Sequence, residues 1–100
     1  EWTVLTDHLG GEAGVQMKAS YGWSGGGNGT NSSGFSGLPG GYRLTNGYFF
    51  HEGFTGLWWS SSPNGSDAWY RALDNYLENV FRNYYSPRGG MSVRCVRDAE

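Results

Sequence analysis

The last stretch of the chain, from Gly89 onward, constrains the fold most, because it has the pattern of a strand that needs a place in a sheet. A pair of glycines provides a turn, and polar and apolar residues then alternate in Met-Ser-Val-Arg-Cys-Val. A period of two is typical of a half-buried strand. We therefore expect residues 89–98 to close a sheet at the centre of the domain, with Cys95 as a buried packing residue.

The composition favours a loop-rich domain with strands over a helical bundle. The chain has 100 residues, a length typical of one domain, and includes 18 glycines and 17% aromatic residues. Ordering a flexible backbone costs of order 1–2 kcal/mol per residue, and the burial of large rings offsets that cost. Disordered chains are poor in aromatic residues, so we expect a folded chain.

The N-terminal residues predict a short helix. Trp2, Leu5 and Leu9 recur at helical spacing, and Gly10 is a natural C-terminal stop. No capping Ser, Thr or Asp stands before Glu1. We therefore expect the domain to begin upstream of the sequence given.

The middle of the chain predicts a long loop and then a hairpin. Residues 22–41 are rich in Gly, Asn and Ser, with Phe35 and Leu38 as the expected anchors. A loop of this length is typically functional or well packed. Asn46-Gly47 is the signal for a type I′ turn between two strands within residues 42–50.

The second half contains one clear strand and one ambiguous segment. Residues 57–61 are a short apolar run that ends at Pro-Asn-Gly, as expected for a central strand. In residues 68–85 the apolar side chains fit an amphipathic helix, but they also fit two strands, 68–73 and 80–84, joined by a turn. Periodicity alone slightly favours the helix.

Charge and reactive residues point away from nucleic acid, membrane insertion and catalysis. A net charge of −2 provides no basic surface for nucleic acid, and no apolar run has the length of a membrane-spanning helix. His8 and His51 stand apart, as surface residues do, and Ser60 lacks the Gly-x-Ser-x-Gly context of a nucleophile. We therefore expect no enzymatic activity, no cofactor and no metal site.

The residues between Asp67 and Tyr85 mix tyrosine with asparagine, which is typical of a binding surface. Tyr provides a large contact area at low entropy cost, and Asn adapts its hydrogen bonds. The candidate ligand-binding residues are Tyr70, Asp74, Asn75, Tyr76, Leu77, Asn83, Tyr84 and Tyr85. The alternative is that these rings only cover the sheet, and the composition does not decide between the two.

Ordered segments along the chain carry a family resemblance. They are Glu-Trp-Thr at residues 1–3, Asn-Ser-Ser-Gly-Phe-Ser-Gly-Leu-Pro-Gly-Gly-Tyr-Arg at 31–43, Gly-Leu-Trp-Trp-Ser-Ser at 56–61 with Ala-Trp-Tyr-Arg at 68–71, and Met-Ser-Val-Arg-Cys-Val-Arg-Asp at 91–98. Together they resemble the Fibrobacter succinogenes major paralogous domain, within the superfamily of C-type-lectin-like proteins and formylglycine-generating enzymes.

The resemblance implies an α+β fold of the C-type-lectin-like kind, with one N-terminal helix, long Gly-rich loops and a small, mainly antiparallel sheet. It favours the strand pair over the helix in residues 68–85, and it makes residues 1–100 one such domain that lacks its N-terminal part. The expected core is Trp2, Leu5, Phe35, Leu38, Trp58, Val80, Val93, Cys95 and Val96, while Arg94 and Arg97 are expected to pair with carboxylates or carbonyls.

The resemblance also implies a non-catalytic ligand-binding module, extracellular or on the surface of a bacterium, with a glycan or a protein as its ligand. Formylglycine formation uses a pair of cysteines, whereas this chain has only Cys95. Calcium-dependent lectins use Glu-Pro-Asn and Trp-Asn-Asp motifs, of which the chain keeps only Pro63-Asn64.

Some proteins of the superfamily are variable proteins of diversity-generating retroelements, which are altered at Asn codons in this C-terminal region. The mixture of motif residues and other residues in 68–85 is similar to such a variable region, and ordinary members show it as well. The alternative from another class is a structural repeat or assembly domain of a bacterial surface protein.

Overall fold

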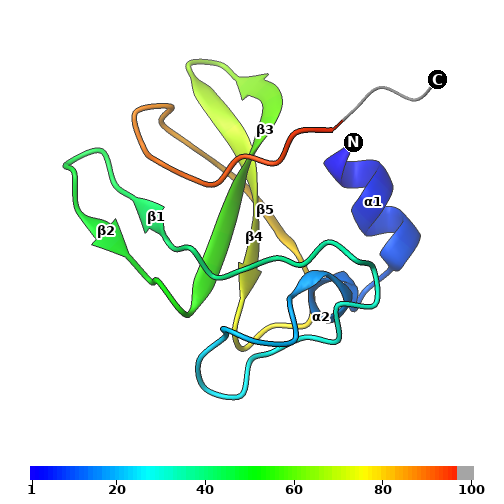
Figure 1. The fold of residues 1–100 in the computed structure, drawn as a ribbon. Helices are drawn as coiled ribbons and strands as arrows, with labels where there is room; N and C mark the ends of the chain where they lie inside the picture. Colours follow the sequence, from blue (N-terminus) through cyan, green and yellow to red (C-terminus); the bar gives the residue numbers. More distant parts are fainter. Residues whose placement is uncertain (97–100) are drawn as a thin grey trace.

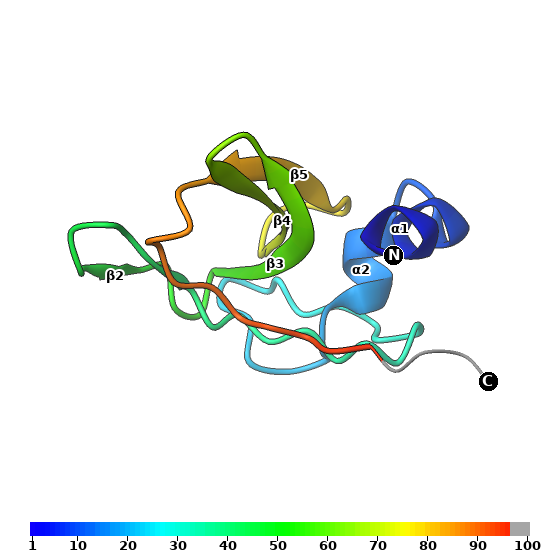
Figure 2. The same ribbon diagram turned by 90° about the horizontal axis from the view of Figure 1, so that it is seen from above.

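The computed structural model describes residues 1–96, which form two helices and two antiparallel sheets (Figure 1). The elements are α1 (Trp2–Leu9), α2 (Ala13–Met17), β1 (Tyr42–Arg43), β2 (Phe49–Phe50), β3 (Thr55–Asn64), β4 (Asp67–Asp74) and β5 (Phe81–Tyr85). The helices lie to one side of the sheet β3–β4–β5, and the β1–β2 hairpin lies to the other (Figures 1 and 2). The expected α+β class, with a short N-terminal helix and antiparallel sheets, is confirmed.

Helix α1 forms where the apolar spacing predicts it, and it ends at Gly10, whose φ of 84° lies in the left-handed region. Trp2, Leu5 and Leu9 pack against the core from its apolar face. The indole Nε1 of Trp2 also donates a hydrogen bond to Trp59 O, at 3.2 Å, which ties α1 to β3.

The prediction of a central strand at residues 57–61 is wrong in its position. The order of the sheet is β3–β4–β5, so β4 is central and β3 is an outer strand. β3 is also longer than expected, because it continues through Pro63 after an interruption of register that begins beyond Trp59. Proline has no N–H to donate and is therefore confined to edge strands and bulges, as it is here.

Residues 68–85 form the strand pair that the family resemblance favours and not the helix that periodicity favours. β4 and β5 are antiparallel, with Tyr70 opposite Asn83 and Ala72 opposite Phe81. Leu73 is fully buried in the core, one residue after Ala72 on the other face. Two half-buried strands joined by a turn can imitate helical spacing, and period alone does not separate them.

The hairpin is where the sequence predicts it, but its turn is of another type. β1 and β2 pair with Tyr42 opposite Phe50, and Gly47 N–H donates to Leu44 O to close the turn. Gly47 has a φ of 95°, whereas Asn46 is not among the residues with positive φ. A type I′ turn needs positive φ at both central residues, so this loop is a type I turn followed by a left-handed glycine.

The core is built largely from residues that the sequence patterns did not select. Its buried apolar residues are Ala13, Met17, Ala19, Trp23, Leu57, Trp58, Ala72 and Leu73. Of the expected core, Trp58 is buried, and Trp2, Leu5, Phe35 and Val80 are partly buried against the same cluster. The loop residue Trp23 donates its Nε1–H to Gly37 O at 3.0 Å, which holds the Gly-rich segment against the core.

The closing segment is not a buried strand, and the predicted core roles of Leu38, Val93, Cys95 and Val96 are wrong. Val93 is 71% and Val96 68% exposed, Cys95 is exposed as a free thiol, and Leu38 is 46% exposed. Ser92 makes a single parallel bridge to Trp58 at the edge of β3, after which the chain leaves the sheet. The alternation of polar and apolar residues indicates a segment that is able to pair as a strand. Other elements, however, already fill the core that its apolar side chains would have to enter.

Arg94 pairs with a carbonyl, as expected. Its Nη1 donates to Phe35 O at 2.8 Å, and its guanidinium carbon lies 4.5 Å from the centre of the Phe35 ring. The corresponding expectation for Arg97, and the end of the predicted strand, lie outside the described residues.

Candidate functional site

Half of the candidate ligand-binding residues share one face of the sheet, the face turned away from the core. Tyr70 and Asn83 are directly opposite each other on β4 and β5. Asp74 lies four residues along β4 and Tyr85 two residues along β5, so strand alternation puts all of them on the same side. The structure therefore brings four of the eight candidate residues together on one face.

These residues border a hollow of about 430 Å³, which we call the sheet hollow. Its aromatic lining is Tyr42, His51, Tyr70, Phe81 and Tyr85; its polar lining is Thr55, Asp74, Arg82 and Asn83; and Leu44, Leu57, Ala72 and Met91 complete it. The β1–β2 hairpin and the segment after β5 supply the wall opposite the sheet. A concave site with several rings and a few convergent polar groups is the usual form of a small-ligand site.

The polar groups of the sheet hollow offer both donors and acceptors. Asp74 accepts a hydrogen bond at Oδ2 from Thr55 Oγ1, at 3.3 Å, and one at Oδ1 from the Tyr76 amide. Asn83 Oδ1 accepts from the Tyr84 amide, which leaves the Asn83 amide nitrogen as a donor. Burial raises the pKa of the Tyr70 phenol, and nearby Tyr42 raises it further, so the hydroxyl stays a donor at neutral pH.

His51 closes the outer rim of the sheet hollow in a strained conformation. Its φ is 62°, in the left-handed region that non-glycine residues rarely adopt. Its ring meets the Tyr42 ring edge-on at 5.5 Å, and its Nδ1 lies 3.5 Å from Tyr42 Oη. Strain of this kind costs of order 1–3 kcal/mol and is concentrated at functional sites.

The other candidate residues do not face the sheet hollow. Asn75 is buried and donates from Nδ2 to Ser24 O at 3.2 Å, so it joins the β4–β5 turn to the Gly-rich loop. Tyr76 is 77% exposed on that turn, and Leu77 is half-buried beside it. Tyr84 lies on the opposite face of the sheet, where its ring meets Trp69 edge-on at 5.2 Å.

The β4–β5 turn is held by a buried lysine that sequence reasoning did not select. The Nζ of Lys18 donates to Asp74 O at 3.1 Å and to Leu77 O at 3.2 Å. Burial lowers the pKa of Lys18, and the charges of Asp74 and Glu78 partly oppose that shift. An ammonium fixed to two backbone carbonyls orients the turn and, with it, the Asp74 end of the hollow.

The sequence patterns also did not identify the residues that line the sheet hollow from the hairpin side. Tyr42, Leu44 and His51 come from a hairpin that the sequence predicted as a local unit, and Met91 comes from the closing segment. A hairpin signal gives the pairing of two strands but not the surface on which they pack. Only the positive φ of His51 marks the site locally, and it is a property of the structure.

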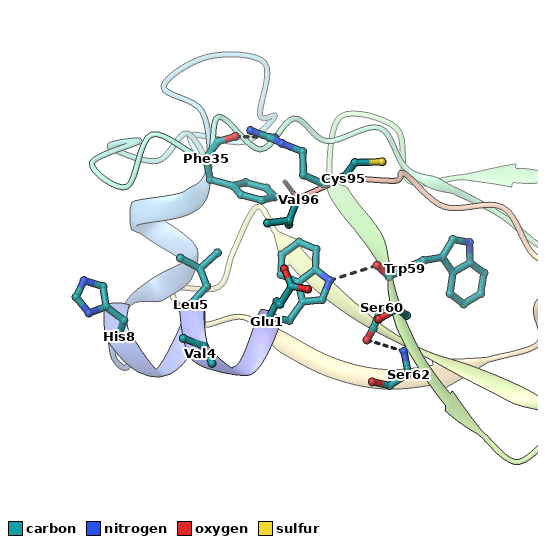
Figure 3. A pocket seen from close by; sticks show the side chains of 13 residues that line it. Glu1, Val4, Leu5, His8, Phe35, Trp59, Ser60, Ser62, Cys95 and Val96 are labelled. Carbon is teal, nitrogen blue, oxygen red and sulfur yellow. Dashed lines mark hydrogen bonds between the residues drawn. The ribbon is translucent and has the colours of Figure 1, made fainter. Parts of the chain in front are cut away.

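A second and larger hollow, of about 900 Å³, lies between α1, β3 and the closing segment (Figure 3). We call it the helix hollow. Leu5, Val4 and Trp59 line it from α1 and β3, and Phe35 and Val96 line it from the loop and the closing segment. The exposed Cys95 also borders it. None of the eight candidate ligand-binding residues lines this hollow.

Within residues 1–96, no group of three or more His, Cys, Asp or Glu side chains is arranged to hold a metal ion. The described part of the chain also has no helix that is long and apolar enough to cross a membrane.

The fold and the sheet hollow define a small α+β domain with an aromatic-lined concave surface. The family model described as the Fibrobacter succinogenes major domain (Fib_succ_major) matches residues 1–97, and the chain belongs to this family. The expected family is therefore confirmed. Comparisons with curated proteins and with solved structures gave no match.

Proposed function

We propose that this domain is a non-catalytic binding module that holds a carbohydrate in the sheet hollow. The observation that carries the proposal is the convergence of aromatic rings with hydrogen-bond donors and acceptors around one concavity of about 430 Å³. Saccharides have apolar C–H faces, which pack on aromatic rings, and hydroxyls that both donate and accept hydrogen bonds. Asp74 accepts, the amide of Asn83 and the phenol of Tyr70 donate, and together they match that chemistry.

The lining of the hollow supports binding over catalysis. It contains one His and one Asp among the described residues, without a Ser or Cys nucleophile. His51 Nδ1 already faces Tyr42 Oη, and the Asp74 carboxylate already accepts from Thr55 and from a backbone amide. These groups are suited to orienting a ligand and to desolvating its hydroxyls.

We further propose a C-type-lectin-like architecture, with display outside the cell or on a bacterial surface. The short N-terminal helix, the long Gly-rich loops and the small antiparallel sheets support this assignment. Residues of the hollow are then the positions of diversification, including diversification by a retroelement at Asn83. Sibling sequences that vary evenly along the chain, and not around the hollow, would contradict this.

Glycan-array screening of the 100-residue chain, followed by calorimetry with the best oligosaccharide, tests the proposal. Asn83→Ala removes a donor in the hollow, and Asn79→Ala is the matched control because Asn79 is exposed and does not line the hollow. We expect Asn83→Ala to weaken binding about tenfold, as the loss of a buried polar contact does. Binding that Asn83→Ala and Tyr70→Phe both leave unchanged would place the ligand elsewhere.

A second candidate function, assembly with other copies or other surface proteins, is supported by the hairpin. Tyr48 is 68% and Phe49 78% exposed, and Phe50 and Phe54 are partly exposed nearby. Clustered exposed rings of this kind mark interaction surfaces. Analytical ultracentrifugation of the wild-type chain and of Phe49→Ser tests this function. A concentration-dependent dimer lost in the variant would support it, and a monomer at all concentrations would count against it.

A further inference from the structure

Among residues 1–96, no segment pairs with the outer edge of β3 where it borders the helix hollow. Up to Trp59 that edge is covered by the chain itself, because Ser92 N–H donates to Leu57 O and Ser92 O accepts from the Trp59 amide. The closing segment then leaves the sheet. Residues 60–62 have no partner residue in β4 either, because the register is interrupted there.

The helix hollow lies along this edge and not over one face of the strand. Trp59, Ser60, Ser61 and Ser62 are consecutive, and all of them line it. Side chains alternate between the two faces of a strand, so a hollow above one face would be lined by every second residue. Consecutive lining residues place the main chain of β3 in the wall of the hollow.

The wall opposite this edge is mainly apolar, with Glu1 and His8 as its polar members, and a hydrogen bond joins it to the strand. Trp2, Val4 and Leu5 of α1 line it, and the bond from Trp2 Nε1 to Trp59 O joins the wall to the strand at one end. The Trp2 ring packs against Phe35 with 5.6 Å between ring centres, which fixes the floor. Figure 3 shows Val4 and Leu5 on one side of the hollow and Ser60 and Ser62 on the other.

The side chain of Arg94 provides a positive charge at the end of the helix hollow that the closing segment lines. The guanidinium of Arg94 is oriented by its hydrogen bond to Phe35 O and by the Phe35 ring, and these contacts use one of its five N–H donors. The remaining donors suit a carboxylate, which guanidinium groups bind in a planar, two-pronged geometry.

From these features we propose that the helix hollow binds an extended peptide segment of another protein, which adds a strand to the open edge of β3. The main chain of the peptide pairs with β3 around Ser61, since the Ser62 N–H already donates to Ser60 Oγ at 3.1 Å. Its apolar side chains contact Val4 and Leu5, and an acidic residue reaches Arg94. Strand addition to an exposed edge combines main-chain hydrogen bonds with side-chain pockets in this way. A volume of about 900 Å³ is at the upper end for a ligand site and accommodates several residues.

The test uses fluorescein-labelled, end-blocked hexapeptides in which Val or Leu alternates with Thr and one end carries Asp, with binding measured by anisotropy. Val4→Glu places a charge on the apolar wall without disturbing the fold, because Val4 is 74% exposed. Val93→Glu is the matched control: Val93 is 71% exposed and does not line the hollow. We expect Val4→Glu to weaken binding about tenfold or more and Val93→Glu to change it less than about twofold.

A second pair of variants separates strand addition from general adhesion. Ser61→Pro removes the edge N–H and should abolish binding, whereas Ser61→Ala keeps the N–H and should retain it. Thermal unfolding of each variant verifies that it is folded. If Ser61→Pro does not fold, protection of the backbone amides of residues 60–62 from hydrogen exchange in the peptide complex decides the question.

The proposal is overturned if no peptide of the set binds below about 1 mM. It is also overturned if binding tolerates both Val4→Glu and Ser61→Pro, or if the amide signals that shift on binding are those of the sheet hollow. Tyr70 and Asn83 do not line the helix hollow. The variants Tyr70→Phe and Asn83→Ala should therefore still bind the peptide, whether or not they bind carbohydrate.

Discussion

β4, one wall of the sheet hollow, is backed by the core, whereas the β1–β2 hairpin, on the opposite side, exposes most of its aromatic rings, although Tyr42 is half-buried. Behind β4, Leu73 is 1% exposed and packs in the cluster with Met17 and Trp58. On the hairpin, Phe49 is 78% exposed. Segments with few buried apolar contacts open at lower free energy than core strands. The sheet hollow therefore combines a wall backed by the core with a wall that has fewer buried apolar contacts.

The largest expected effect tests whether the wall formed by β4 depends on the core. Leu73→Ala should reduce the free energy of unfolding by about 2–5 kcal/mol, because it leaves a cavity where no neighbour can collapse easily. Phe49→Ala, on the hairpin, should change it by about 0.5 kcal/mol or less. Urea denaturation followed by tryptophan fluorescence measures both. Equal losses in the two variants would abolish the contrast between the walls.

The next largest expected effect tests whether α2 supports the β4–β5 turn. A Cβ added at Gly14 would lie 2.6 Å from Asn79 O and 2.7 Å from Glu78 O, so backbone must shift to accept it. We expect Gly14→Ala to destabilise the fold by about 1–3 kcal/mol. Gly11→Ala is the matched control, since an added Cβ there meets nothing within 4 Å. If both variants unfold at the same urea concentration, α2 does not brace the turn.

A smaller effect separates the two neighbouring turn residues. Asn75→Ala leaves the buried Ser24 carbonyl without its donor and should cost roughly 1–2 kcal/mol. Tyr76→Ala removes an exposed ring and should cost about 0.5 kcal/mol or less. Thermal unfolding of the two variants checks this difference. If Asn75→Ala is as stable as the wild-type chain but binds carbohydrate more weakly, Asn75 contacts the ligand and is not mainly structural.

The smallest expected effect is on the way the free energy of unfolding depends on pH. Lys18, behind the sheet hollow, and Tyr70, within it, should change that free energy in opposite directions as the pH rises. The pKa of Lys18 is lowered from 10.5, so the unfolded chain binds more protons between the lowered pKa and 10.5, and Lys18 makes stability rise with pH there. The pKa of Tyr70 is raised from 10.0, so above pH 10 the folded chain binds more protons and stability falls as pH rises. Lys18→Met should remove the rise, and Tyr70→Phe should remove the fall.

Urea midpoints of the wild-type chain and these two variants, measured between about pH 8 and pH 11, test the prediction, since a group's contribution changes only near its pKa values. Identical pH profiles for all three proteins would show that neither group differs between the folded and unfolded states. A wild-type profile steeper than that of Lys18→Met, below pH 10, is the expected result.

Local signals predicted local structure well. The helix at residues 2–9 and the hairpin near Asn46-Gly47 both formed, because apolar spacing and turn residues act within a few residues of one another. The β4–β5 pair was indicated by the family resemblance, whereas the local periodicity favoured a helix there. The same signals failed for the closing segment. An alternating run shows that a segment can pair, but pairing also needs a free edge and room inside, and Met17 and Trp23 occupy the interior instead.

The candidate site was predicted in the same partial way. The composition of the segment selected Tyr70, Asp74, Asn83 and Tyr85, and the period of two along adjacent strands puts these four on one face. Tyr42 and His51 were not found, because no sequence pattern states on which surface a hairpin packs. Asn75 and Tyr84 were grouped with the site by sequence proximity, although burial and strand alternation direct them elsewhere.

The sequence by itself determined the family and the α+β class from its ordered motifs and composition, and the family resemblance, not the periodicity, indicated the strand pair. Only the tertiary structure decided that a buried Lys18 holds the turn, that the hairpin lines the sheet hollow and that, among residues 1–96, no segment pairs with the edge of β3 beyond Trp59. These features arise where segments distant in the chain meet. Their geometry depends on which of several apolar segments fills the core, and that choice is made by packing the whole chain at once.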